Sequence, residues 1–187
     1  MAGLGGNLQS VITPHGLRVM VHDTDKQGMF VRGSATPSER FRHLLREMGP
    51  LFARIENQML VVGHTDAVQY AGMDSAAFSN WALSTNRAMA ARAQLLAGGM
   101  PTSSILQVVG MADRAPLDKQ APKAGVNRRI ELLILTTAQA RNISAMFGMP
   151  SQTTALTDGV DAVAPDAATL QALRHQLGPN TDPAGAH

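Results

Sequence analysis

The sequence predicts an α/β fold, an α+β sandwich in which a mixed sheet of about four strands carries two main helices. Short apolar runs, typical of buried strands, alternate with two longer segments whose apolar residues recur every three or four positions, as on one helical face. The predicted order is strand, helix, strand, helix, strand, loop, strand. Strands that alternate with helices in this way require at least one parallel pair, with the helices packed on the sheet.

The composition fits one ordinary domain with extensions. The chain has 187 residues, and a single hydrophobic core usually serves about 100 to 200 residues. Its net charge of +2 offers no broad basic field of the kind that nucleic-acid-binding proteins use. Because the chain has no cysteine, it excludes disulfides, thiol nucleophiles, cysteine-ligated zinc and a lipid-modified N-terminal cysteine. No apolar stretch approaches the roughly 20 residues that cross a bilayer.

The first predicted strand covers Leu17 to His22, a short apolar run that contains β-branched residues. It stops at a turn-rich cluster, Asp23 to Gly28. Residues 1–15, which precede this strand, carry no regular pattern and are expected to form a linker.

The first helix is expected to begin at Pro37. Thr36 is a suitable N-cap residue, proline is favoured at the first helical position, and Glu39 occupies the third. Pro50 is expected to kink or divide the helix. The apolar residues that define its buried face are Phe41, Leu44, Leu45, Met48, Phe52 and Ile55.

The second half of the core contains three more strands and one more helix. Met59 to Val62 is a continuous apolar run, typical of a strand that is covered on both faces. A long helix then covers Asn80 to about Ala97, with Ser79 as its N-cap and two glycines after its end. Two further buried strands are expected at Ile105–Met111 and Ile130–Leu135.

The predicted core therefore spans residues 16–136. Residues 137–187 are rich in Ala, Thr, Asp, Pro and Gly, and their few large apolar groups do not offset the entropy of ordering. We expect this tail to be largely flexible. A short amphipathic helix is possible over 166–177, because three leucines fall on one stripe there.

An arginine interrupts the apolar stripe of the second helix. Leu83, Arg87, Ala91 and Leu95 follow one another at intervals of four and so share a face. Asp66 follows the second strand, and ligands of open α/β sheets bind beyond the carboxyl ends of strands. The guanidinium and the carboxylate could together hold a zwitterion. The alternative is a structural ion pair that ties a loop to the helix.

Other polar residues give weaker signals. His64 and Asp66 form an H-x-D pair, which is at most the start of a metal site because no third ligand lies nearby, and a structural histidine is the more common case. Asn127-Arg128-Arg129 is either an exposed strand entry or part of the crevice. Asp113 follows the third strand as Asp66 follows the second and could line the same site. No glycine-rich phosphate loop is present, so no nucleotide site is expected.

Three segments resemble the OmpA-like peptidoglycan-binding domain, and the spaced pattern N-x-x-L-S-x-x-R-A in the second is specific to it. These segments are Val61-Val62-Gly63-His64-Thr65-Asp66, Asn80-Trp81-Ala82-Leu83-Ser84-Thr85-Asn86-Arg87-Ala88 and Asn127-Arg128-Arg129-Ile130-Glu131. From about Gly16 to Leu135 the chain also looks like the periplasmic part of the flagellar stator B subunit, the MotB family. The further matching segments are Gly33-Ser34-Ala35, Ser79-Asn80-Trp81 and Val108-Val109-Gly110-Met111-Ala112. Ala91 stands where the family often has valine.

The resemblance implies an OmpA-like βαβαβ(β) domain that is not an enzyme and needs no metal or cofactor. It implies binding of the peptidoglycan stem peptide at diaminopimelate, which is a zwitterion. Carried over motif by motif, Asp66 and Arg87 hold this group, and Thr65, Asn80 and Arg128 line the same pocket.

The resemblance also implies how the protein works in the cell. It implies a homodimeric periplasmic domain that anchors the flagellar motor to the cell wall, in a full-length parent in the inner membrane. There, a membrane segment outside this sequence contacts the stator A subunit, which forms the ion channel.

Two alternatives stay open. One is an OmpA-like anchor of another envelope system, a secretion machine or a lipoprotein, although the absence of cysteine argues against the lipoprotein. The other is a metal-assisted hydrolase that uses His64 and Asp66, against which the lack of a third ligand and of a general acid/base pair argues.

Overall fold

The computed structural model describes residues 8–24, 28–68 and 79–148, together with Ala168, Gln171 and Ala172. The chain divides into two units, Met1–Gly148 and Met149–His187. The three described residues of the second unit are helical, and the rest of the short helix expected over 166–177 lies outside the described residues. No helix in the described ranges has both the length and the apolar character needed to cross a membrane.

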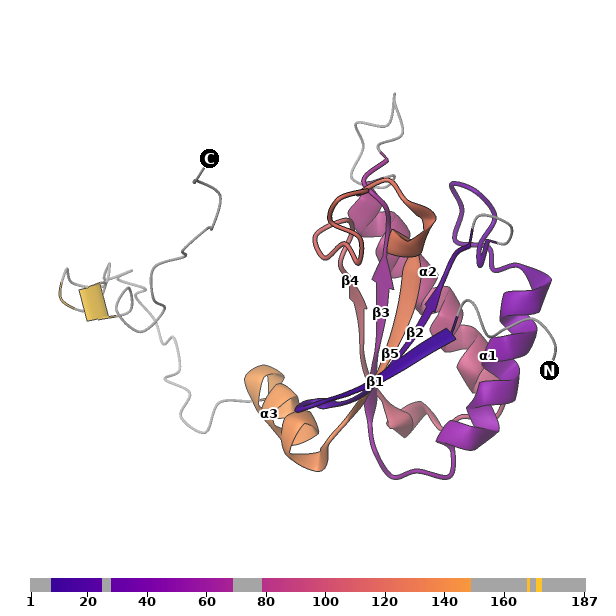
Figure 1. Ribbon diagram of the computed structural model, residues 1–187. Coiled ribbons are helices and arrows are strands. Elements are labelled where there is room, and N and C mark those ends of the chain that lie inside the picture. The colour runs from indigo at the N-terminus through magenta and orange to yellow at the C-terminus, as the bar shows by residue number, and fades with distance from the viewer. Residues whose placement is uncertain (1–7, 25–27, 69–78, 149–167, 169–170, 173–187) are drawn as a thin grey trace, which may run out of the picture. The chain divides into compact units, whose positions relative to one another are not determined.

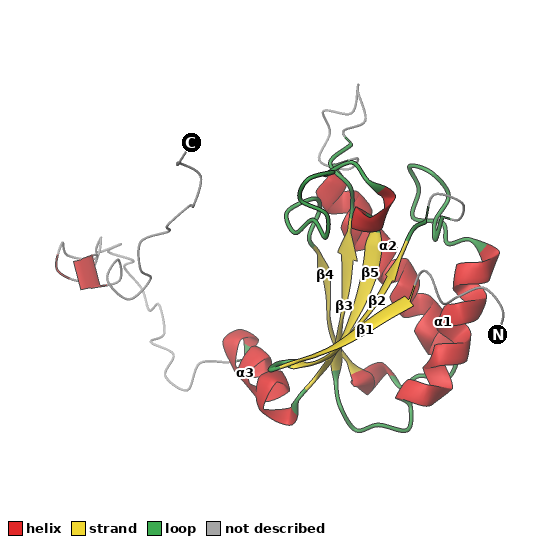
Figure 2. Cartoon of the chain, in the orientation of Figure 1, coloured by secondary structure: helices red, strands yellow, loops and turns green. Residues whose placement is uncertain are grey.

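The first unit is built on a mixed five-stranded sheet (Figures 1 and 2). In spatial order the strands are β1-β2-β5-β3-β4. β3 and β4 are parallel and all other neighbours are antiparallel, which confirms the predicted mixed sheet. The bounds are β1 (Leu8–Thr13), β2 (Gly16–His22), β3 (Met59–His64), β4 (Ile105–Gly110) and β5 (Arg129–Leu135).

The additional strand, β1, corrects the linker prediction for Leu8–Thr13, whereas residues 1–7 lie outside the described residues. β1 pairs with β2 along its whole length through a tight turn, in which the Thr13 hydroxyl donates to the Gly16 carbonyl (2.9 Å). Five of its six residues are exposed. The strand is therefore held by backbone hydrogen bonds at the sheet edge, and it lacks the buried apolar pattern by which strands are identified in a sequence.

Helices α1 (Glu39–Phe52) and α2 (Asn80–Ala97) lie on one side of the sheet (Figure 2). The bounds and the Ser79 cap of α2 are as predicted, but α1 begins two residues later than expected. Its N-cap is Ser38, whose hydroxyl accepts from the Phe41 amide. Pro37 is instead extended, because it bridges to Phe30. Pro50 lies inside α1 and does not divide the helix, which continues to Phe52.

The hydrophobic core fills the space between these two helices and the sheet. The buried face of α1 carries most of the predicted stripe, although Phe52 is only partly buried and Ile55 lies beyond the helix end. α2 lies so close to the sheet that a Cβ at Gly63 would overlap the Ser84 carbonyl oxygen. Core side chains that are fully buried are Leu45, Met59, Val61, Leu95, Ile130 and Leu132.

Helix α3 (Thr137–Phe147) corrects the prediction that the flexible tail begins at residue 137. The Thr136 hydroxyl caps it by accepting from the Gln139 amide (3.2 Å). Only Ala140 of this helix is buried. Because α3 is stabilised by its cap and its helix-forming residues more than by burial, the apolar content of the sequence did not reveal it.

We expect Gly63→Ala to lower the free energy of unfolding by about 1 to 3 kcal/mol, as overpacking of a close contact typically does. The added methyl group would push α2 away from β3, because the obstacle is the backbone of Ser84. Urea unfolding measures the change. Gly148→Ala is the matched control, since Gly148 has a φ of −73° and its added Cβ would lie 3.2 Å from its nearest atom. An equal loss in both variants would contradict this interpretation of Gly63.

Candidate functional site

A polar pocket lies at one end of the sheet, where three strand ends meet. β2 and β3 both run antiparallel to β5, so their carboxyl ends lie beside the beginning of β5. The pocket has a volume of about 380 Å³. Its lining residues are Asp23, Gly28, Phe30, Arg32, Gly33, Asp66, Val68, Arg87, Lys123 and Arg128.

Arg128 joins the three strand ends through two ion pairs. Its Nε donates to Asp23 Oδ2 at 2.7 Å, and its Nη1 donates to Asp66 Oδ2 at 2.6 Å. The Arg128 side chain is 32% exposed, whereas those of Asp23 and Asp66 are 9% and 10% exposed. Burial alone would lower the pKa of Arg128, but the hydrogen bonds that Arg128 donates to Asp23 and Asp66, together with their negative charge, outweigh burial and raise the pKa above its ordinary value. Arg128 therefore stays charged and is an ion-pair partner of both nearly buried carboxylates.

Each aspartate also orders the backbone that follows it. Asp23 Oδ1 accepts from the Met29 amide at 2.6 Å, and Asp66 Oδ1 accepts from the Val68 amide at 3.2 Å. A carboxylate offers about four lone-pair positions. Asp66 thus has acceptor capacity left for a ligand after it binds Arg128 and Val68.

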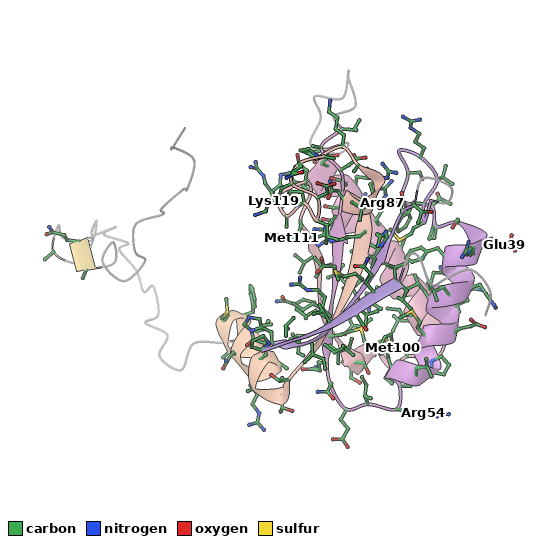
Figure 3. All side chains as sticks on the ribbon, in the orientation of Figure 1. Glu39, Arg54, Arg87, Met100, Met111 and Lys119 are labelled. Carbon is green, nitrogen blue, oxygen red and sulfur yellow. The ribbon has the colours of Figure 1, made fainter. Side chains whose placement is uncertain are left out.

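Arg87 enters the pocket from α2 and is 5% exposed. Its guanidinium carbon lies 5.1 Å from the centre of the Phe30 ring, a cation–π distance, and its Nε donates to the Ser34 carbonyl at 3.0 Å. Figure 3 shows Arg87 and Lys119 toward the same end of the sheet, and Arg54 at the opposite end. The helix thus carries a charged group into the pocket while the loop of Phe30 and Ser34 holds its orientation.

Thr65 and Asn80 are not among the residues that line this pocket. The Thr65 amide donates to the Ala112 carbonyl at 2.8 Å, and its side chain is buried. The Asn80 side-chain amide donates to the carbonyls of Asp66 and Val68, both at 3.3 Å. Asn80 therefore holds the loop that presents Asp66.

The segment between β4 and β5 is held by Asn127, which is completely buried. Its side chain accepts from the Asp118 amide (2.9 Å) and donates to the carbonyls of Asp118 (3.3 Å) and Ala121 (2.9 Å). The Ala67 amide donates to the Pro122 carbonyl at 3.0 Å, which ties this segment to the end of β3. Asp113 lies in the same segment but does not line the pocket.

His64 belongs to a separate, buried charge cluster. Its Nε2 lies 3.5 Å from Glu131 Oε1, and Arg129 donates to the same oxygen at 2.7 Å. Arg18 lies 3.4 Å from the other oxygen of Glu131. Burial, and then the charge of Arg129, lower the pKa of His64 to about 4. No group of three or more potential metal ligands occurs in the part of the chain that the structure describes.

A second pocket, of about 630 Å³, is larger but carries less charge. It is lined by residues of the α1–β3 loop, the β4 entry and α3, with Glu56 and Arg141 as its only ionisable lining residues. None of the residues predicted to bind a ligand lies there. We therefore place the candidate site at the smaller pocket, where buried charged groups converge.

The sequence pointed to three of the lining residues, Asp66, Arg87 and Arg128. It missed the others that carry charge or an aromatic ring, namely Asp23, Phe30, Arg32 and Lys123. Asp23 had a usable signal, because it follows the first predicted strand as Asp66 follows the second. Arg32 and Lys123 had none, since both lie in irregular segments.

We expect the free energy of unfolding to fall between about pH 6.5 and pH 4 because of His64. In this interval the unfolded chain takes up a proton at His64 and the folded chain does not, since its folded pKa is about 4. The stabilisation that comes from keeping His64 neutral is fully present above about pH 6.5. It is lost as the pH falls through about 4, and the full loss is about 3 kcal/mol. Urea unfolding at pH 7 and pH 4.5 measures it.

His64→Gln should flatten this pH dependence, because glutamine does not titrate. His43→Gln is the matched control, since the His43 side chain is 75% exposed. An H64Q protein that loses stability with acid as steeply as the parent would exclude His64 as the cause.

A sequence profile described as OmpA family matches residues 29–129. A truncated flagellar export/assembly protein, LafU, of Escherichia coli K12 is 40% identical over 147 residues, which are 79% of this chain and 68% of the relative. Motility protein B of the same strain is 38% identical over 135 residues, 72% of this chain. The alignment covers only 44% of that protein's length.

Solved structures share the fold at lower identity. The periplasmic domain of Helicobacter pylori MotB (residues 97-256) has a TM-score of 0.56 at 15% identity, over 75% of this chain and 97% of that one. The cell wall anchor of the T6SS from Pseudomonas aeruginosa has a TM-score of 0.57 at 22% identity, over 70% and 89% of the two chains. These likenesses confirm the predicted α/β architecture.

Proposed function

This chain belongs to the OmpA family, as a domain of the MotB type, and we propose that it binds peptidoglycan noncovalently in the pocket of Asp66 and Arg87. Family membership and the relation to Motility protein B support a wall-anchoring role. Domains of this family are noncatalytic anchors, so the chain is not an enzyme, as the sequence predicted. The hydrolase alternative is therefore set aside.

The observation that carries the proposal is that Asp66 and Arg87 line one pocket although they come from different elements. A carboxylate and a guanidinium are the two groups needed to hold a zwitterion such as diaminopimelate. The Arg87 fork pairs with the ligand carboxylate and Asp66 accepts from its ammonium. Arg128 and Asn80 act by holding Asp66 in place, and Thr65 orders the same loop through its amide.

We further propose that the domain anchors a flagellar stator in the periplasm. Its relatives LafU and Motility protein B are named for flagellar assembly and motility. In this reading the full-length protein is a homodimer in the inner membrane and works with the ion-channel subunit, stator A. A net charge of +2 gives no reason to expect nucleic acid as a partner.

The first test is calorimetry with a diaminopimelate-containing muropeptide. We expect Arg87→Ala and Asp66→Asn each to weaken binding at least tenfold, because hydrogen bonds to charged groups contribute about 1.5 to 3 kcal/mol. Arg87→Lys keeps the charge and the side-chain stem, and we expect it to restore only part of the affinity because lysine lacks the guanidinium fork.

The control is Arg54→Ala, which removes an exposed arginine at the opposite end of the sheet (Figure 3). Circular dichroism checks that each variant is folded. Binding that is unchanged in the folded Arg87 and Asp66 variants, or absent in the parent chain, would contradict the proposed site. Sedimentation of the parent chain with intact peptidoglycan checks the role itself.

A second candidate is the anchor of another envelope machine, favoured by the shared fold with the T6SS cell wall anchor. A chimera that joins this domain to the membrane segment of a motility protein distinguishes the two. If the domain is a stator anchor, we expect the chimera to restore swimming in cells that lack their own stator B subunit. Stable expression without swimming, with wall binding retained, would favour the other machine.

A further inference from the structure

We propose that Arg32 and Lys123 form a second carboxylate-binding position at the pocket mouth, which selects stem peptides whose D-glutamate carboxylate is free rather than amidated. This inference rests on the proposed function and deepens it. It concerns Arg32 and Lys123, which lie outside the sequence segments that resemble the OmpA-like domain.

The lining of the pocket carries more positive than negative charge. Four cationic side chains and two carboxylates line the pocket. Arg128 is bound to both carboxylates, and Arg87 is the partner of one ligand carboxylate in the proposed function. A zwitterion is neutral overall, so it leaves the positive charge of Arg32 and Lys123 unmatched.

The side chains of Arg32 and Lys123 are accessible to a ligand. Both residues are exposed, and neither has an ion pair or side-chain hydrogen bond within the described ranges 8–24, 28–68 and 79–148. Charged groups that line a pocket without a protein partner are free to bind a charge on the ligand.

Backbone hydrogen bonds hold the segments that carry Arg32 and Lys123. Arg32 lies in a turn that is closed by the Val31 amide to the Thr36 carbonyl (2.9 Å), with Gly33 at a φ of 69°. Lys123 follows Pro122, whose carbonyl accepts from the Ala67 amide, one residue after Asp66. The backbone at Arg32 is therefore held in a closed turn, and the backbone before Lys123 is tied to the residue that follows Asp66.

The ligand chemistry matches this arrangement. In a diaminopimelate stem the preceding residue is D-glutamate joined through its γ-carboxyl, so its α-carboxylate is one residue away from the zwitterion. Amidation removes that negative charge without changing the size of the group appreciably. Since exposed ion pairs are individually weak, we expect the two cations together to favour the free acid about three- to tenfold.

The test is calorimetry of the parent chain with the tripeptide L-Ala-γ-D-Glu-meso-diaminopimelate and with its α-amide on glutamate. We expect the parent to bind the free acid more tightly. In the double variant Arg32→Gln/Lys123→Gln this preference should disappear, because binding of the free acid weakens more than binding of the amide. The matched control is Arg114→Gln/Lys119→Gln, which removes the same charge from exposed residues that do not line the pocket.

Equal binding of both peptides by the parent, or an equal loss for both in the double variant, would overturn this inference and leave the proposed function intact. A control variant that loses the preference for the free acid as the test variant does would also overturn this inference. If the parent binds neither peptide, the proposed function fails as well. The preference should also decline with added salt, because exposed charges are screened.

Discussion

The guanidinium of Arg128, bound between Asp23 and Asp66, is the interaction on which the site depends. It connects the ends of β2 and β3 to the start of β5, so one side chain fixes the relative positions of three strand ends. Two nearly buried carboxylates would be costly without a partner, and pairing with Arg128 offsets part of that cost.

The same end of the domain is stiffened from the helix side. Glycines at 63 and 110 let α2 approach the sheet, and the Ser84 hydroxyl accepts from the Ala112 amide at 3.0 Å. Arg87 in turn holds the loop of Phe30 and Ser34. A pocket whose side chains are held in this way loses little entropy when a ligand binds.

Charge is also buried on the other face of the sheet, where Glu131 meets Arg129, His64 and Arg18. This cluster accounts for the histidine of the H-x-D pair. His64 faces the charge cluster and Asp66 faces the pocket, so the two side chains serve different environments although they are two residues apart. The H-x-D spacing places both side chains on one face only if the strand continues through Asp66. β3 ends at His64, so the two side chains diverge.

The sequence by itself determined the core of the fold, because hydrophobic periodicity and helix caps are local signals. They were sufficient for β2, β3, β4, β5 and α2, and for α1 to within two residues at its start. The position of Asp66 after a strand and of Arg87 in an apolar stripe also indicated a carboxylate and a guanidinium beside one pocket. Only the tertiary structure decided that β1 and α3 form, because both are stabilised by hydrogen bonds with little burial. It also decided that Asp66 is paired with Arg128, and that Arg32 and Lys123 complete the pocket. Those contacts join segments far apart in the chain, and their geometry depends on how the strands are ordered in the sheet.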